Sequence, residues 1–272
     1  MDRGESFLDH DIGLEEFITG NRFIDACDRT GAVFCKTDHV SELSHEVVRV
    51  LVTHNSDCHV NSARLALRPR GVRRWFAQNK AVASELVQGI PIGLENRRLR
   101  VSPAARGGRF SSEVHGAALK ARRIEELRQA DPRKRRLAYL NATVETFPDE
   151  RLPLRELARR LPWLTTRSRL PMGRYYEDVA THRFVICPRG NGTDCHRVWE
   201  ALYLRAVPVV LASTTMDEFR DLPILFLGSW EQLDRRFLQE RYEELVARRY
   251  DLGKMRMSYW EARIAAAVRE AA

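Results

Sequence analysis

Short apolar segments alternate with stretches of helical spacing along most of the chain. Segments with the composition of buried strands cover residues 31–35, 48–53, 75–77, 90–92, 137–140, 183–187, 206–211 and 224–227. Apolar residues at helical spacing cover residues 13–28, 117–129, 149–160, 194–204, 230–249 and 254–271. Parallel strands need a crossover, usually a helix, between them, so this alternation favours parallel sheets. The pattern predicts an α/β fold.

One segment interrupts the alternation. Residues 97–114 lack apolar periodicity and are rich in Gly, Ser, Pro and Arg, a composition typical of a linker. We therefore expect two lobes with a cleft between them. The first, residues 1–105, is predicted to be a Rossmann-like lobe, and the second, residues 106–272, includes the C-terminal helices.

The composition indicates a folded protein of the cytoplasm. Of the 272 residues, 44% are hydrophobic and 30% are charged, as in soluble globular proteins. No apolar run approaches the roughly 18 residues of a membrane span, and the polar, acidic N-terminus does not resemble a secretory signal. The five cysteines form no C-x-x-C pair, so we expect free thiols and neither a structural zinc nor a disulfide framework.

The net charge of +8 points to an anionic ligand. Arginine supplies most of the positive charge, and its planar fork suits phosphate and carboxylate groups. A nucleotide sugar, a nucleic acid or an anionic lipid would fit, and arginine-rich codon usage in a GC-rich genome is an equally weighted explanation. Because the arginines are spread along the chain and form no known recognition motif, we do not expect a nucleic-acid partner.

The most informative stretch runs from Arg183 to Leu211. A predicted buried strand ends at Cys187, a loop with two glycines follows Pro188, and Thr193 or Asp194 could cap the next helix. A loop that leads into a helix N-terminus presents unpaired N–H groups to an anion. An ordinary turn is the alternative. The loop matches neither the P-loop pattern nor the dinucleotide pattern G-x-G-x-x-G.

Three polar residues share one side of this predicted helix. His196 and Arg197 lie four and three residues before Glu200, and such spacings place side chains next to each other. A carboxylate one to two turns from the helix start could accept hydrogen bonds from two ribose hydroxyls. Glu200 could also be a surface charge paired with Arg197. Val198, Ala201 and Leu202 are expected to face the core.

The segment from Arg189 to Leu202 resembles the C-terminal signature of exostosin-type glycosyltransferases and is more similar still to the ribitol xylosyltransferase-like branch. Weaker similarity extends over about residues 20 to 250. It is carried by residues 139–141 with Thr146 and Arg151, 175–176, 54–57, 75–79 and 91–96. The resemblance implies a GT-B enzyme, in which two Rossmann-like domains face each other across a cleft. The donor would bind the C-terminal domain, usually without a metal.

The resemblance also implies an activity and a donor site. The chain would transfer a hexosyl or pentosyl group from a nucleotide sugar, which the resemblance implies to be UDP-linked, to a glycan or glycoconjugate acceptor. It would need no cofactor, because the nucleotide sugar is a substrate. The donor-binding residues would be Arg189, Gly190, Asn191, Gly192, Thr193, Asp194, His196, Arg197 and Glu200. A basic nucleic-acid-binding protein and an inactive GT-B scaffold are the alternatives.

The acceptor side is less defined. Animal relatives carry a membrane anchor, which we do not expect for this chain, and the N-terminal half is short for an acceptor domain. A general base is expected there, because sugar transfer with inversion requires removal of the acceptor's hydroxyl proton. His54 and Asp57 follow the predicted strand 48–53 and are the first candidates, and Glu95 is the third. Alternatively, residues 55–57 only cap the following helix.

Two further motifs carry charge. Asp9-His10-Asp11 has the D-x-D form of a metal motif but precedes any predicted strand, so we interpret it as surface and expect no metal site. The basic run Arg133-Lys134-Arg135-Arg136 enters a predicted strand. We interpret it as a solvated loop, although it would also suit an anionic surface and peripheral association with a membrane.

Overall fold

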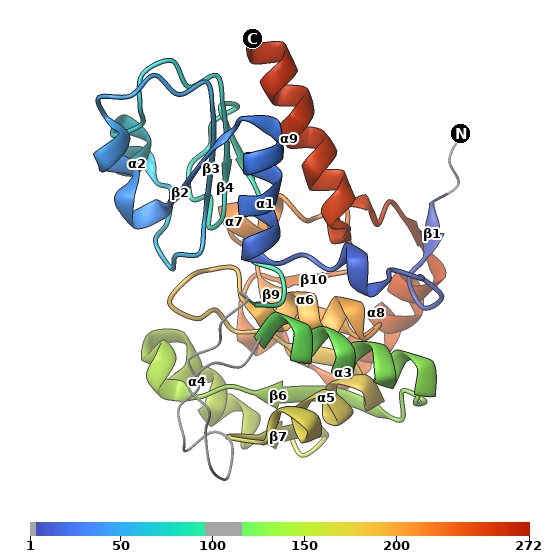
Figure 1. Ribbon diagram of the computed structural model, residues 1–272. Coiled ribbons are helices and arrows are strands. Elements are labelled where there is room, and N and C mark those ends of the chain that lie inside the picture. Colours follow the sequence, from blue (N-terminus) through green and yellow to red (C-terminus); the bar gives the residue numbers. More distant parts are fainter. Residues whose placement is uncertain (1–3, 96–115) are drawn as a thin grey trace.

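Two separate parallel β-sheets form the centres of two lobes in the computed structural model, which describes residues 4–95 and 116–272 (Figure 1). The predicted α/β fold with two Rossmann-like lobes is thereby confirmed, since no strand joins the two sheets in the described ranges. The predicted linker, residues 97–114, and the predicted boundary after residue 105 lie outside those ranges.

The N-terminal sheet has its strands in chain order. They are β2 (Val33–Lys36), β3 (Val50–His54), β4 (Arg74–Ala77) and β5 (Val87–Gly89), all parallel. Alternate side chains point to opposite faces of a strand. Val50 and Val52 of β3 accordingly join the main core, whereas Leu51 packs with Trp75 in a second, smaller core. The short helix α2 (Ser62–Ala66) belongs to this lobe.

The C-terminal sheet has the spatial order β10-β9-β8-β6-β7, again all parallel. Its strands are β6 (Arg136–Asn141), β7 (Leu164–Arg167), β8 (His182–Ile186), β9 (Val207–Leu211) and β10 (Leu225–Leu227). The chain runs outward from β6 to β7 and then returns to the other side of β6 to form β8. The strand order therefore reverses between β6 and β8, and such a reversal leaves a crevice at the carboxyl ends of the two strands.

Six helices belong to the described part of the C-terminal lobe. They are α3 (Gly116–Ala130), α4 (Pro148–Ala158), α5 (Met172–Thr181), α6 (His196–Tyr203), α7 (Thr214–Asp217) and α8 (Arg235–Ala247). Helix α3 packs on α5, which contacts β6 and β8, while α6 contacts β8 and β9. The start of α3 and the start of α6 consequently lie near the crevice between β6 and β8.

Both ends of the chain cross between the lobes. Strand β1 (Glu5–Ser6) pairs with β11 (Arg249–Tyr250), which follows α8. The last helix, α9 (Met257–Ala271), packs against β3 and α1 (Gly20–Thr30) of the N-terminal lobe, and Figure 1 shows α9 and α1 side by side. The predicted C-terminal lobe, residues 106–272, included this last helix, which in the structure packs against elements of the N-terminal lobe.

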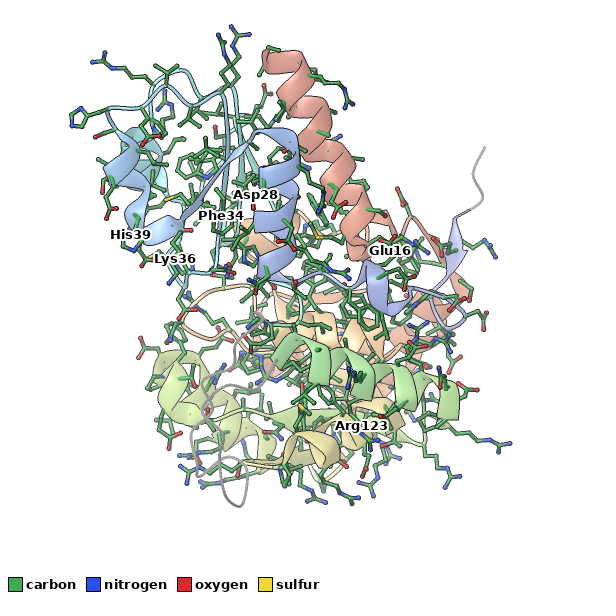
Figure 2. All side chains as sticks on the ribbon, viewed as in Figure 1. Glu16, Asp28, Phe34, Lys36, His39 and Arg123 are labelled. Carbon is green, nitrogen blue, oxygen red and sulfur yellow. The ribbon has the colours of Figure 1, made fainter. Side chains whose placement is uncertain are left out.

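Several elements differ from the predicted pattern. Strand β7 and helix α5 were not predicted, and β5 precedes the expected strand 90–92. The predicted helix 13–28 is divided into a single 3₁₀ turn, η1 (Leu14–Glu16), and α1. The division falls at Thr19, whose hydroxyl accepts the N–H of Arg22 and so begins α1. Charged side chains surround both lobes, among them Asp28 on α1 and Arg123 on α3 (Figure 2).

Candidate functional site

A pocket of about 470 Å³ lies at the reversal point of the C-terminal sheet. Asn141 ends β6, Lys120 comes from α3, and the start of α6 supplies one wall. The lining residues are Lys120, Asn141, Thr143, Thr146, Arg151, Arg169, Leu170, Met172, Tyr175, Tyr176, Cys195, His196, Arg197 and Glu200. Many of the residues that carry the exostosin resemblance therefore surround one cavity, although they are spread over 60 positions of the sequence, from Asn141 to Glu200.

The helix after the glycine-containing loop begins at His196, two residues later than predicted. Asp194 therefore caps no helix. Its carboxylate accepts the backbone N–H of Ile92 at 2.7 Å and the indole N–H of Trp199 at 2.9 Å. Burial raises the pKa of Asp194 to about 7. Among the predicted donor residues, Asp194 thus joins the two lobes and does not line the pocket.

The middle of the loop faces the N-terminal lobe. Asn191 donates to the Asp57 carboxylate at 3.2 Å, and the Thr193 hydroxyl lies 2.8 Å from His59 Nε2. A Cβ on Gly192 would lie 2.5 Å from the side chain of Asn79, so only glycine permits this close approach. Asn191, Gly192 and Thr193 are therefore interlobe contacts in this structure and are not pocket residues.

Arg189 does not line the pocket. Its guanidinium lies over the ring of Phe147, 4.3 Å from the centroid, and donates to the carbonyl of Asn191 at 2.8 Å. The main chain at this point is held by Arg151, which donates from Nε to the carbonyl of Arg189 at 2.8 Å. Gly190 lies beside Arg151, since a Cβ there would be 3.6 Å from its Nη2 atom. Arg151, which was not among the predicted donor residues, fixes the loop.

Arg197, the second residue of α6, lines the pocket, in contrast to Arg189. Its Nε atom is buried and has no hydrogen-bond partner, and its Nη1 atom makes only a 3.5 Å contact with the carbonyl of Pro188 and a 4.0 Å contact with the sulfur of Cys195. A buried, unsatisfied N–H group costs about 1–3 kcal/mol unless a ligand or water supplies the acceptor. The guanidinium is thus prepared for an anion, at the end of a helix that also favours negative charge.

Glu200 lies deeper in the same pocket and is 5% exposed. Its Oε1 atom accepts from Lys120 Nζ at 2.8 Å and from the Tyr176 hydroxyl at 2.9 Å, and Oε2 accepts from Tyr175 at 2.9 Å. Burial raises the pKa of Glu200, but the Lys120 ammonium outweighs this effect and lowers the pKa to about 2. The carboxylate is therefore ionised and fixed in position.

Lys120 connects Glu200 to the N-terminal lobe. Besides Glu200, its ammonium donates to the carbonyl of Leu94 at 3.1 Å and lies 3.4 Å from the Glu95 carboxylate. Burial lowers the pKa of Lys120, but the two carboxylates outweigh it and hold the pKa above its usual value. Lys120 escaped the sequence analysis because it lies 80 residues before Glu200 in a helix whose other features indicated only packing.

Glu95 is the predicted base nearest to the pocket. Its carboxylate lies 3.6 Å from His196 Nε2, and His196 donates from Nδ1 to the carbonyl of Gly93 at 2.7 Å. Burial, followed by the charge of Lys120, lowers the pKa of His196. Both neighbours of Glu95, His196 and Lys120, line the pocket, so this carboxylate lies at its border with the N-terminal lobe.

The other two base candidates lie elsewhere. His54 is 1% exposed, donates from Nε2 to the carbonyl of Pro91 at 2.9 Å, and accepts the N–H of Asn55 on Nδ1 at 2.8 Å. Burial lowers its pKa to about 4, and its Nδ1 atom also lies 2.8 Å from the side-chain oxygen of Asn55. His54 does not line the pocket, and its role as base stays a prediction. Asp57 is exposed and bonded to Asn191, outside the pocket.

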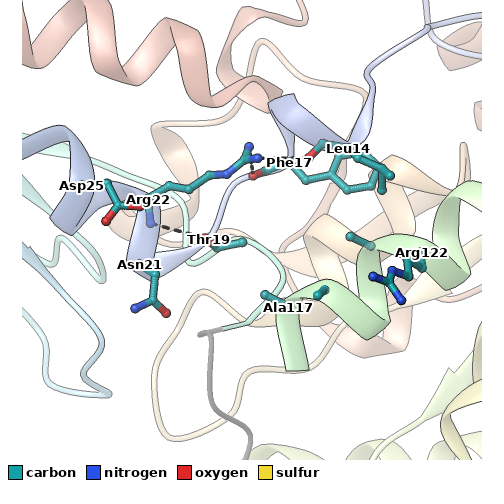
Figure 3. Close-up of a pocket in the computed structure, with 10 residues that line it drawn as sticks. Leu14, Phe17, Thr19, Asn21, Arg22, Asp25, Ala117 and Arg122 are labelled. Atoms are coloured by element: carbon teal, nitrogen blue, oxygen red, sulfur yellow. Dashed lines mark hydrogen bonds between the residues drawn. The ribbon is translucent and has the colours of Figure 1, made fainter. Parts of the chain in front are cut away.

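A second cavity, of about 400 Å³, lies between the start of α1 and the first turns of α3 (Figure 3). Its walls are mostly apolar, with Leu14, Phe17 and Ala117 among them, and Thr19, Asn21 and Asp25 add polar groups. Arg22 donates to the carbonyls of Leu14 and Phe17 and so fixes one wall. Ala121 in this cavity and Lys120 in the pocket are neighbours on α3, so α3 separates the two spaces.

Asp9-His10-Asp11 is only partly surface, because His10 is 2% exposed and bonds to the carbonyl of Leu202. No three His, Cys, Asp or Glu side chains in residues 4–95 and 116–272 are grouped as a metal site would require. All five cysteines are free thiols, as predicted. None of the helices in the described ranges has both the length and the hydrophobicity needed to cross a bilayer.

Comparison with known proteins gives little further information. No protein-family model matches the chain, and no curated protein matches it. Among solved structures, the chain is similar to AviGT4, a glycosyltransferase involved in avilamycin A biosynthesis. The sequence identity is 14%, the TM-score is 0.40, and the alignment covers 92% of this chain and 87% of that one. A similarity at this level carries no argument about function, which must be made from the site itself.

Proposed function

We propose that the chain is a glycosyltransferase of the exostosin-like GT-B type, which binds a UDP-linked sugar in the pocket between β6 and β8. The observation that carries the proposal is the Arg197 guanidinium in that pocket, whose buried Nε atom has no hydrogen-bond partner, one turn of α6 before the fixed carboxylate of Glu200. The three-residue separation corresponds to a rise of about 4.5 Å along the helix. A nucleoside diphosphate offers an anion and a pair of ribose hydroxyls at comparable spacing.

In this proposal the pyrophosphate lies against Arg197 and the N-terminus of α6, with Lys120, Arg151 and Arg169 adding positive charge to the wall. Glu200 accepts a hydrogen bond from a ribose hydroxyl. A carboxylate has about four lone-pair positions, and three protein donors already occupy Glu200, so one ribose hydroxyl is expected where the sequence suggested two. Arg189 supports the loop and takes no direct part in phosphate binding.

The transfer itself then needs a base and a leaving-group partner. The acceptor hydroxyl oxygen forms a bond to the anomeric carbon while the bond from that carbon to the diphosphate oxygen breaks. Glu95, at the border of the pocket and the N-terminal lobe, takes the hydroxyl proton. Arg197 stabilises the negative charge that develops on the diphosphate. Because these cations meet the phosphate charge, we propose a reaction that needs no divalent metal.

The acceptor approaches from the N-terminal side. The cavity between α1 and α3 adjoins the pocket across a single helix, and its apolar walls with polar ends suit a glycoconjugate that combines apolar and hydroxyl-bearing parts. The acceptor is thus placed on the side of the pocket where Glu95 lies.

Hydrolysis of a nucleotide-sugar panel tests the function. The panel contains UDP-, GDP- and CMP-sugars, and release of the nucleotide is measured with the wild-type chain and with Arg197→Ala. We expect slow release from a UDP-sugar by the wild type and at least a tenfold lower rate with the variant. Equal rates for both proteins, or release from none of the donors together with no detectable UDP binding, would contradict the proposal.

A further inference from the structure

The basic run at residues 133–136 divides into two pairs in the structure. Arg133 and Lys134 line a pocket of about 240 Å³, whereas Arg135 and Arg136 do not. Arg135 instead lies just before β6, donates its backbone N–H to the carbonyl of Thr181 and has an exposed side chain. Two of the four basic residues therefore line a defined cavity, which the interpretation of the run as a solvated loop did not predict.

Positive charge is concentrated in this pocket. The ends of α3 and α6, the N-terminal segment and the loop before β6 form its walls, and its cations are Arg128, Arg133, Lys134 and Arg205. The lining itself contains two carboxylates, Asp9 and Asp131, and both are exposed. Asp131 lies 3.8 Å from Arg205, while Asp11 and Glu125, outside the lining, lie 3.5 and 3.4 Å from Arg128. Among the lining residues, four cations thus accompany two acids, and a concentration of positive groups attracts anions.

Lys134 differs from the two arginines because no carboxylate in residues 4–95 and 116–272 pairs with it. Within these ranges its Nζ atom donates to the carbonyls of Leu204 at 2.8 Å and Val179 at 3.5 Å. Burial, with a smaller contribution from the charge of Arg205, lowers the pKa of Lys134 to about 7. An anion near the ammonium would relieve this penalty on the charged form.

Two arginines in the same pocket have unsatisfied groups. Arg128 is 9% exposed, and its nearest carboxylate oxygens, on Glu125 and Asp11, lie 3.4 and 3.5 Å away. The Nε atoms of Arg128 and Arg205 are both buried and have no hydrogen-bond partner. Apart from the contacts with carboxylates, both arginines donate to the carbonyl of His10. Planar guanidinium groups with open N–H positions suit a phosphate group.

This pocket is separate from the nucleotide pocket. The two pockets lie at opposite ends of β6, which begins at Arg136 and ends at Asn141. They also lie at different positions along α3, because Lys120 and Arg128 are about 12 Å apart along the helix axis. A ligand in one pocket cannot occupy the other.

We propose that the cavity formed by Arg128, Arg133, Lys134 and Arg205 is a second anion site, which binds a phosphate group independently of the nucleotide pocket. The phosphate belongs either to a free phosphorylated compound or to a lipid headgroup. The wall of this second anion site contains Leu8 and Asp9 of the N-terminal segment, so a bound phosphate group would also hold that segment against the C-terminal lobe.

Equilibrium dialysis with radiolabelled inorganic phosphate tests the site. The measurement is made at constant ionic strength, in the presence and absence of UDP. We expect one bound phosphate per chain that UDP does not displace, with affinity lowered at least tenfold by Lys134→Met and severalfold by Arg133→Ser. Arg135→Ser is the matched control, because it removes the same charge from the same run outside the pocket, and its affinity should change less than twofold.

The outcomes separate this proposal from the proposed function. If Arg135→Ser weakens phosphate binding as much as Arg133→Ser does, nonspecific electrostatic attraction explains the binding and the proposed site is refuted. The site is also refuted if phosphate binding does not saturate. If UDP does not bind to the chain, the expected effects of the substitutions on phosphate binding stay the same. Co-sedimentation with phosphatidylcholine vesicles that contain phosphatidic acid then identifies the source of the phosphate group. Loss of sedimentation in Arg133→Ser but not in Arg135→Ser indicates a lipid headgroup. No sedimentation of the wild type indicates a free phosphorylated compound.

Discussion

Replacing Arg197 by alanine tests the assignment of the phosphate site. Arg197 lines the pocket, and its Nε atom has no partner, so the variant loses few protein contacts besides a 3.5 Å contact with the Pro188 carbonyl. A hydrogen bond to a charged group contributes about 1.5–3 kcal/mol. Loss of one such bond to the pyrophosphate should weaken UDP binding roughly ten- to a hundredfold.

The matched control is Arg189→Ala. Arg189 has the same charge and lies in the loop that leads into α6, but its guanidinium is stacked on Phe147 and bonded to the Asn191 carbonyl. Exposed stacking of this kind is worth about 0.5–1 kcal/mol, and its loss should affect the loop more than the ligand. We therefore expect the UDP affinity of Arg189→Ala to fall less than that of Arg197→Ala.

Isothermal titration calorimetry with UDP measures both affinities, and thermal unfolding of each variant checks that the fold is retained. Arg197→Lys should fall between the wild type and Arg197→Ala, because it keeps the charge but not the planar fork. The reasoning is refuted if Arg197→Ala binds UDP like the wild type, or if Arg189→Ala loses more affinity than Arg197→Ala.

Three further predictions concern the base, the lobes and the metal. Glu95→Gln should lower kcat about 10²–10⁴-fold with little change in UDP affinity, whereas His54→Ala should mainly lower the thermal midpoint; unchanged kcat in Glu95→Gln would exclude this base. Because the pKa of Asp194 is raised to about 7 in the fold and is near 3.9 in an unfolded chain, the folded state binds its proton more tightly between these values. Its contribution to the free energy of unfolding should thus decrease as pH rises from 4 to 7, and urea titrations of Asp194→Asn should lack this decrease. Turnover should persist in EDTA, and activity that disappears there and returns with manganese would contradict a metal-independent reaction.

Much of the sheet architecture was predictable because buried parallel strands have continuous apolar sequences. Strand β8 and strand β9 stand out for this reason. Strand β7 did not, since it lies at the edge of its sheet and three of its four residues, Thr165, Thr166 and Arg167, are polar. Edge strands need less burial, so their composition carries a weaker signal.

The candidate site was predictable where it depends on one helix. The spacing of His196, Arg197 and Glu200 placed them on one side of α6, and all three line the pocket; Val198 is buried on the other side as expected. Contacts between distant segments were not predictable. Lys120 and Glu200 meet only because α3 packs beside the reversal point of the sheet.

The loop before α6 shows a second limit. Thr193 and Asp194 have the composition of helix caps, but their side chains are used by partners from the N-terminal lobe, His59 and the N–H of Ile92. Local sequence preferences are overruled where tertiary partners satisfy the same polar groups. The donor residues predicted from the loop are therefore divided between the pocket and the contact between the lobes.

A crystal structure of the chain with UDP tests the central claim most directly. The account predicts that the pyrophosphate lies in the pocket between β6 and β8, within hydrogen-bond distance of the Arg197 guanidinium, with a ribose hydroxyl on Glu200. UDP bound outside this pocket, or bound within it with Arg197 still unpartnered and Arg189 on the phosphate, would contradict the account.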